Sequence, residues 1–176
     1  GLEISPEKSK VTNLKKNSSD FLGFKIKAVP QGKSKYGYVA KTDMCEKALK
    51  KSKANLRQKI LEIQNHTNAE EVKKYNSAVT GIQNYYRIAT NVYNNLTEVD
   101  YALLRTRNNR LRKKAKIVRF GETPSDFKKK TTGIRDCKKI YRIMDIHMLP
   151  ITGVHHKSPM NFSQEICNYT EKGRKK

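Results

Sequence analysis

The densest group of side chains able to do chemistry is a run of cations between residues 105 and 119. Eight Lys and Arg residues fall in this run, and no Asp or Glu lies between Tyr101 and Arg119. An ordinary solvated helix face is the alternative interpretation, but such a face mixes charges of both signs. Guanidinium and ammonium groups donate strong hydrogen bonds to phosphate oxygens. We therefore expect nucleic-acid contacts from Arg105, Arg107, Arg110, Arg112, Lys113, Lys114 and Lys116.

A second group combines an amide, an aromatic ring and a guanidinium within four residues. Asn84, Tyr85 and Arg87 lie together in the segment Gly81–Thr90. Aromatic rings stack on unpaired bases, and amides read base edges or 2′-hydroxyls, so this set suits RNA binding. From spacing alone, a core tyrosine with ordinary polar neighbours is an equally good interpretation.

The scattered His and Cys residues suggest a metal site, which their spacing does not favour. His147, His155, His156, Cys137 and Cys167 form no Cys-x-x-Cys or His-x-x-x-His pair. The sequence also lacks an Asp-Asp pair, a nucleophile elbow and a phosphate-binding Gly-x-x-x-x-Gly-Lys loop. We therefore expect no catalytic residue, no metal and no other cofactor in this chain. A metal-dependent nuclease built on the His and Cys residues is a weak hypothesis.

The net charge narrows the class of partner. Lys and Arg number 38 against 16 Asp and Glu, so the formal net charge is +22. Such an imbalance destabilises a compact state by self-repulsion and is typical of a protein with a polyanionic partner. No run of about 18 apolar residues is present, so we expect no membrane insertion. Three widely spaced cysteines argue against a disulfide framework and favour a reducing compartment such as the cytoplasm.

The elements that must position these groups begin with β-structure. Apolar and polar residues alternate over Asp20–Ala28, which predicts a strand. The turn-forming residues Pro30–Lys35 and the following Tyr36–Ala40 predict an antiparallel hairpin. We expect a shorter strand at Lys10–Leu14.

Three helices are expected after the hairpin. The first is capped by Thr42 or Asp43 and ends at about Asn65. The third begins at Thr97. Short connections between the helices predict a three-helix bundle. The apolar residues expected to face its core are Leu49, Leu56, Ile60 and Ile63 in the first helix and Tyr101, Leu104, Leu111 and Ala115 in the third.

The second helix has the clearest pattern. Asn68, with Glu71 three residues later, resembles a capping box. Apolar residues then recur at spacings of three and four, at Val72, Tyr75, Val79, Ile82, Tyr86, Ala89 and Tyr93. Tyr85 and Tyr86 differ by about 100° around a helix axis, so both cannot occupy one narrow seam. We expect Tyr86 to face the core and Tyr85 to face a binding surface.

The last segment, residues 120–176, is interrupted repeatedly by Gly and Pro, which predicts a looser basic module. One short helix is expected at Asp136–Met144. The fold class expected for the whole chain is α+β and mainly α: a short antiparallel hairpin, a three-helix bundle and an irregular C-terminal module.

Five segments in this order resemble the group II intron-encoded reverse transcriptase/maturase family. They are Gly1–Lys10, Asp20-Phe-Leu-Gly-Phe24, Tyr75-Asn76, Gly81-Ile-Gln-Asn-Tyr-Tyr86 and Tyr169-Thr-Glu-Lys-Gly-Arg174. The resemblance implies that residues 1–41 end a polymerase palm, residues 42–118 form the helical thumb or maturase domain, and residues 119–176 begin a DNA-binding region. It adds Lys8, Lys10, Phe21, Leu22, Gly23 and Phe24 to the expected nucleic-acid contacts.

The resemblance also implies partners and missing parts. The parent would be an RNA-directed DNA polymerase that uses Mg²⁺, with its fingers, palm and catalytic Asp-Asp motif upstream of Gly1 and, in many members, a nuclease downstream. The partners implied are intron RNA, an RNA–DNA template–primer duplex and target DNA, in splicing and retrohoming. The alternative from a different class is a stand-alone basic architectural protein that binds RNA or DNA. We expect the fragment alone to show no polymerase activity.

Overall fold

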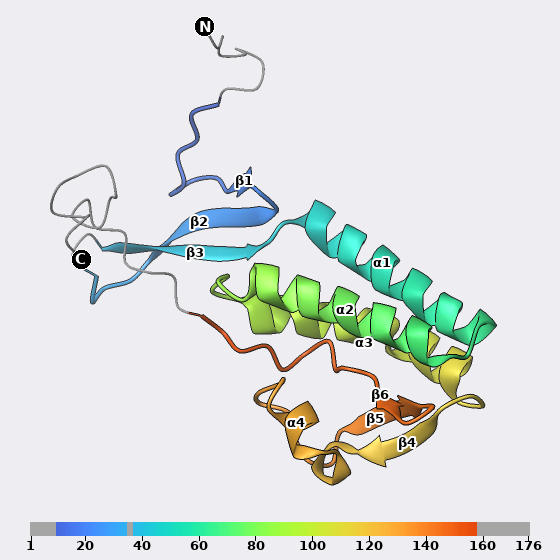
Figure 1. Cartoon of the computed structure of the whole chain (residues 1–176). Helices are drawn as coiled ribbons and strands as arrows, with labels where there is room; N and C mark the ends of the chain where they lie inside the picture. Colours follow the sequence, from blue (N-terminus) through green and yellow to red (C-terminus); the bar gives the residue numbers. More distant parts are fainter. Residues whose placement is uncertain (1–9, 35–36, 158–176) are drawn as a thin grey trace, which may run out of the picture.

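A small antiparallel sheet forms the first part of the computed structural model, which describes residues 10–34 and 37–157 (Figure 1). Its strands are β1 (Ser19–Phe21), β2 (Phe24–Pro30) and β3 (Tyr38–Met44), in the order β1-β2-β3. The expected hairpin is present as β2 and β3. Predictions that fall on Lys8, Tyr36, Cys167 and Tyr169–Arg174 lie outside the described residues.

The strand predicted over Asp20–Ala28 is in fact two strands joined by a two-residue turn. Leu22 and Gly23 have φ values of 48° and 82°, and Phe21 pairs with Phe24. Positive φ at both central residues defines the hairpin turn that best matches strand twist. The strand predicted at Lys10–Leu14 is absent, although the Leu14 carbonyl accepts a hydrogen bond from Ala28 N (3.0 Å).

The predicted cap of the first helix is wrong because Thr42 and Asp43 belong to β3. Helix α1 (Glu46–Asn65) begins after Cys45 and ends where predicted. The Asp43 carboxylate instead accepts hydrogen bonds from the side-chain amides of Asn91 (3.2 Å) and Asn95 (3.4 Å). Residues that resemble caps in the sequence therefore join the sheet to a later helix.

Helix α2 (Ala69–Tyr86) begins as predicted, because the Asn68 side chain accepts a hydrogen bond from Glu71 N (2.9 Å). Val72, Tyr75 and Val79 are buried in the core. The helix ends seven residues before the predicted Tyr93, since β3 binds the chain that follows it: Thr42 O accepts from Asn91 N (3.1 Å). The apolar spacing continues past the break because Ala89 is also buried.

Helix α3 (Val92–Leu111) starts before the predicted Thr97 and ends before Ala115, which was expected to belong to it. Tyr101 and Leu104 are 79% and 42% exposed, so the predicted core face is wrong for both. The chain leaves α3 at Leu111 and forms strand β4 from Lys116. The cationic run is therefore spread over a helix, a turn and a strand. The α3 residues that do enter the core are Val92, Leu96, Val99, Leu103 and Leu111.

A second antiparallel sheet replaces the predicted irregular module over the described residues after α3. Its strands are β4 (Lys116–Arg119), β5 (Lys139–Ile143) and β6 (Ile146–His147), with a 3-10 turn (Phe120–Glu122) and the short α4 (Ser125–Lys128) between β4 and β5. The helix predicted at Asp136–Met144 is wrong, since its centre is strand β5. The boundary expected between residues 118 and 119 falls inside β4.

One core joins the helices to the second sheet. Tyr141, Ile143, Met148, Leu149 and Ile151 are buried in the same cluster as the α1–α3 residues. Figure 1 shows the helices lying between the two sheets. The fold is α+β and mainly α, as the sequence predicts. Within the described ranges, no helix is long and apolar enough to cross a bilayer.

Candidate nucleic-acid interface

Five of the predicted phosphate-binding cations are exposed along the last two turns of α3, the turn that follows it and the start of β4. Arg105, Arg110, Arg112, Lys113 and Lys116 are all exposed, and none forms a salt bridge with a described residue. We call these five residues the α3–β4 cationic surface. Arg112 also lines an open groove of about 760 Å³, together with Leu104, Asn108, Ile117, Lys139 and Tyr141. Cations without acidic partners can bind phosphate without breaking an existing ion pair.

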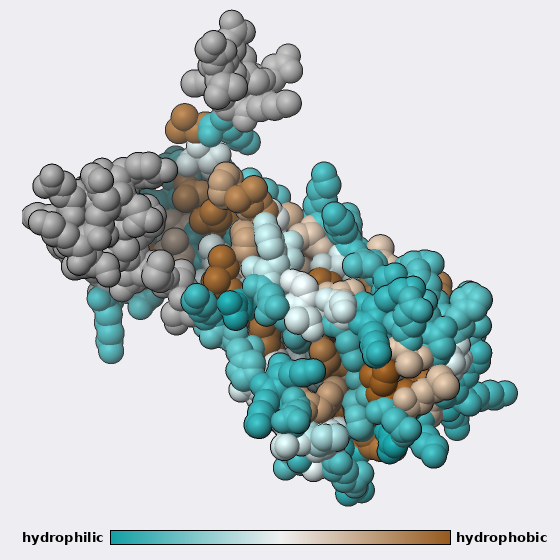
Figure 2. All heavy atoms as spheres, viewed as in Figure 1, coloured by the Kyte–Doolittle hydropathy of each residue, from teal (hydrophilic) through white to brown (hydrophobic). Residues whose placement is uncertain are grey.

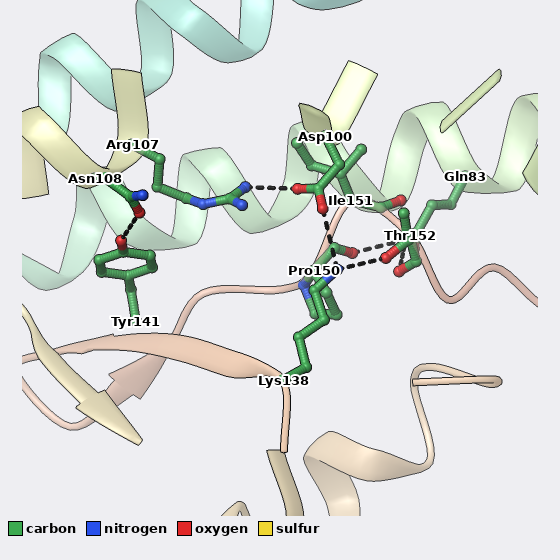
Figure 3. A network of polar contacts seen from close by, with 9 residues as sticks. All are labelled: Gln83, Asp100, Arg107, Asn108, Lys138, Tyr141, Pro150, Ile151 and Thr152. Atoms are coloured by element: carbon green, nitrogen blue, oxygen red, sulfur yellow. Dashed lines mark hydrogen bonds and ion pairs between the residues drawn. The ribbon is translucent and has the colours of Figure 1, made fainter. Parts of the chain in front are cut away.

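Arg107 does not belong to this surface, which corrects the sequence prediction. It is only 8% exposed, and its Nη1 lies 2.7 Å from Asp100 Oδ1 (Figure 3). Lys138 Nζ binds the other carboxylate oxygen of Asp100 at 3.0 Å. Burial alone would raise the pKa of Asp100, but the two cations hold that pKa below its usual value. Arg107 is a structural cation whose partner is Asp100, and Lys138 is the second, distant cation on the same carboxylate.

Lys114 has a structural contact despite its exposure. Its Nζ donates a hydrogen bond to the Gln64 carbonyl, in the last turn of α1. The last carbonyls of a helix lack partners within the helix and carry partial negative charge, so a cation there stabilises the helix end. Lys114 therefore links the turn after α3 to α1.

A polar network fixes the second sheet against α2 and α3 (Figure 3). The buried Gln83 side chain donates to the carbonyls of Pro150 and Ile151, both at 3.0 Å. Lys138 Nζ donates to Thr152 Oγ1 (2.8 Å). The Tyr141 hydroxyl donates to Asn108 Oδ1 on α3. These bonds satisfy buried polar groups at the seam, so the sheet is held at a defined position on the helices.

The hairpin turn and the end of α2 are in direct contact. Tyr85 stacks on Phe24 with ring centroids 5.6 Å apart and an interplanar angle of 21°, and its hydroxyl donates to the Leu22 carbonyl (2.8 Å). Tyr86 covers Gly23, where an added Cβ would lie 2.8 Å from the Tyr86 hydroxyl. The structure thus brings the turn Phe21–Phe24 into contact with the last turn of α2.

The exposed side chains where the hairpin turn meets α2 differ in how many contacts they already make. Phe21 and Leu22 are 63% and 67% exposed at the turn, and Tyr85 is 51% exposed with one hydrogen bond made. Tyr86 is half-buried against the core, so the relative phase predicted for the two tyrosines is confirmed. Lys10 is exposed at the start of the described chain.

Asn84 and Arg87 line a second, larger groove of about 1050 Å³ between α2 and the second sheet. We call it the α2 groove. Figure 2 looks onto this side of the molecule and shows pale, weakly polar atoms over part of α2, with brown apolar atoms between them and the second sheet. Phe127, Lys130 and His147 also line this groove, and they come from the part of the chain expected to be irregular.

The His and Cys residues do not converge where the structure describes them. Over residues 10–34 and 37–157, no group of three or more His, Cys, Asp or Glu side chains is arranged to hold a metal ion. Cys45 is buried and Cys137 is exposed. Cys167, the second cysteine of the metal hypothesis beside Cys137, lies outside the described residues.

Comparison of the chain with protein-family models, with curated proteins and with solved structures finds no match.

Proposed function

We propose that this chain binds structured RNA through the α3–β4 cationic surface, as the thumb and maturase region of a group II intron reverse transcriptase would. Intron RNA and an RNA–DNA template–primer duplex are the partners proposed for this surface, and target DNA is a further partner. The α3–β4 cationic surface would bind the phosphate backbone of a duplex. Base pairing or other parts of the parent protein would recognise the sequence.

One observation carries the proposal: Arg105, Arg110, Arg112, Lys113 and Lys116 are exposed and form no salt bridge with any described residue. Other exposed cations of the described chain, such as Lys73 and Lys130, are also unpaired, but these five fall in a segment that has no Asp or Glu between Tyr101 and Arg119. A one-sign surface repels itself in the free protein and is relieved when phosphates approach it. Backbone phosphates suit this surface because Arg and Lys side chains contact them without reading sequence.

The experiment is a binding measurement with a labelled RNA hairpin, comparing two triple variants of equal charge. Arg110→Ala/Arg112→Ala/Lys113→Ala removes three cations from the α3–β4 cationic surface. Lys47→Ala/Lys50→Ala/Lys51→Ala removes three exposed cations at the other end of α1. Lys114, the neighbour of Lys113, contacts the last turn of α1, whereas Lys47, Lys50 and Lys51 lie in its first two turns. The helix is 20 residues long, so the two groups of cations are separated by on the order of 30 Å along α1.

We expect the first variant to bind the hairpin at least about tenfold more weakly than wild type, since each phosphate contact contributes to affinity. The second variant should lose much less. Equal losses would indicate attraction to net charge alone, and unchanged binding by the first variant would refute the proposed surface.

A further inference from the structure

We propose that the α2 groove binds a single-stranded segment of nucleic acid, with an unpaired base against its aromatic wall and phosphates on its rim. The proposal rests on the proposed function, since it assumes that the chain binds nucleic acid. It assigns a second site, separate from the α3–β4 cationic surface.

One wall of the groove is a polar face of α2. The helical spacing places small or amide-bearing side chains along one line, and all of these positions except Asn76 are exposed. The α2 residues concerned are Asn76, Ser77, Thr80, Gly81 and Asn84, with Lys73 at one end. The Asn76 side chain is already bonded to the His147 carbonyl (2.9 Å) and to Leu149 N (2.7 Å), so Ser77, Thr80 and Asn84 are the exposed polar groups of this wall. Side chains of this kind donate to and accept from base edges and 2′-hydroxyls.

Gly81 is the unusual residue of this wall. Glycine inside a helix costs about 1 kcal/mol relative to alanine. A Cβ added to Gly81 would meet nothing within 4 Å, so packing among the described residues does not require glycine there. The absence of a side chain keeps the centre of the groove open.

The opposite wall is aromatic and apolar. Phe127 and His147 lie with ring centroids 5.3 Å apart, and Ile146, Leu149 and Val154 complete this side. Burial and the nearby Arg142 lower the pKa of His147, so its ring is neutral at physiological pH and is available for stacking. Stacking on such rings is tolerant of sequence, because every base has a π-face.

The charges at the rim favour an anion. Lys73, Arg87 and Lys130 line the groove and form no salt bridge with described residues. Asp145 is the single acid among the described lining residues, and its carboxylate is already paired with Arg142. An aromatic wall between cations is the arrangement used to hold single strands.

The size of the groove favours an unpaired strand over a duplex. Its volume of about 1050 Å³ is close to the upper end of the roughly 300–1,000 Å³ typical of small-ligand sites. Such a space suits one or two nucleotides inserted between its walls. A duplex has its bases stacked and paired inside, so it could not place a base against Phe127 and His147 without being opened.

The test uses the whole 176-residue chain and a variant that fills the groove without harming the helix. Gly81→Gln adds a neutral side chain where there is open space, and it replaces glycine with a better helix former. The matched control is Ala54→Gln, which adds the same side chain to an exposed position of α1 outside the groove. The probes are a labelled single-stranded RNA of about 10 nucleotides, within the usual range of site sizes, and a labelled RNA hairpin.

We expect Gly81→Gln to weaken single-strand binding about tenfold, to leave hairpin binding within about twofold, and to keep or raise the melting temperature. Ala54→Gln should leave both affinities unchanged. A second variant, Lys73→Gln/Lys130→Gln, should also weaken single-strand binding selectively.

Four outcomes would overturn the proposal. Single-strand affinity unchanged in both groove variants would show that the strand binds elsewhere, while hairpin binding through the α3–β4 cationic surface would still stand. Equal loss for hairpin and single strand would make the groove part of the duplex surface. Competition by a poly-glutamate peptide as strong as that by unlabelled RNA would indicate an acidic protein segment as its ligand. If neither RNA binds to wild type, both this site and the proposed function fail.

Discussion

Single residues of one cationic run have different roles in this molecule. Arg107 is buried against Asp100, Lys114 binds the end of α1, and Arg112 extends beside a groove without an acidic partner. The sequence predicts all three as phosphate ligands because it shows only their common charge. Asp100 lies seven residues before Arg107 on the same face of α3, so the spacing allows this pair but does not show that it is buried. The contact between Lys114 and Gln64 joins residues 50 apart, and no local spacing contains that information.

Replacing Arg107 tests its structural role. Removing one member of a buried ion pair typically costs about 3–5 kcal/mol. We expect Arg107→Met to cost about 3 kcal/mol, since Lys138 still neutralises Asp100. Denaturant unfolding measures this loss. Arg112→Met, at an exposed position, should stay within about 0.5 kcal/mol of wild type. Similar stabilities for the two variants would contradict the assignment of Arg107 to the core.

The same ion pair predicts a pH dependence of stability. Arg107 and Lys138 lower the folded-state pKa of Asp100, so the unfolded chain takes up a proton first as the pH falls. The contribution of Asp100 is therefore complete above its unfolded pKa of about 3.9 and is lost as the pH falls through the lower folded value. Unfolding of wild type, Asp100→Asn and the control Asp126→Asn between about pH 6 and pH 2 measures it.

We expect Asp100→Asn to be less stable at neutral pH and to lose less stability on acidification than wild type. Asp126, whose side chain is 87% exposed, should give the wild-type slope when replaced by Asn. An acid slope that is the same in all three proteins would show that Asp100 is not the titrating group.

At the scale of elements, the buried faces of α1 and α2 were predictable, while the helix ends and the buried face of α3 were not. The apolar spacing located Leu56, Ile60 and Ile63 in α1 and Val72, Tyr75 and Val79 in α2, because burial follows the helical period. The boundaries moved because tertiary hydrogen bonds override local signals, as where Thr42 binds the chain after α2. Strand β5 was mistaken for a helix, since a short apolar run has no distinguishing period.

The β1–β2 turn gives a test at this scale. Gly23 has a φ of 82° and lies under Tyr86, so a side chain there is strained and meets the Tyr86 hydroxyl. We expect Gly23→Ala to destabilise the fold by about 1–2 kcal/mol, the usual cost of the left-handed conformation. Gly32→Ala is the control, because Gly32 has open space and no positive φ. Equal melting temperatures for both variants would show that the turn does not need glycine.

For the whole molecule, the fold class could be predicted from the sequence, while the candidate grooves could be located only in the folded structure. The +22 charge pointed to a polyanionic partner. The α2 groove could not be predicted, because Lys73 and Lys130 line one groove only when the chain after α3 packs on α2, where Gln83 binds the segment that follows β6. Asn84 and Arg87 were selected from the sequence, and they line this groove with partners that sequence spacing does not reveal.

The most direct test of the account is the salt dependence of hairpin RNA binding by the wild-type chain and by Arg110→Ala/Arg112→Ala/Lys113→Ala. If exposed cations bind phosphates, the logarithm of the association constant falls steeply and linearly with the logarithm of salt concentration. Each lost contact should flatten that slope by about one unit, so we expect a change of about three units in the variant. A flat slope for wild type, or the same slope for both proteins, would contradict phosphate binding by the α3–β4 cationic surface.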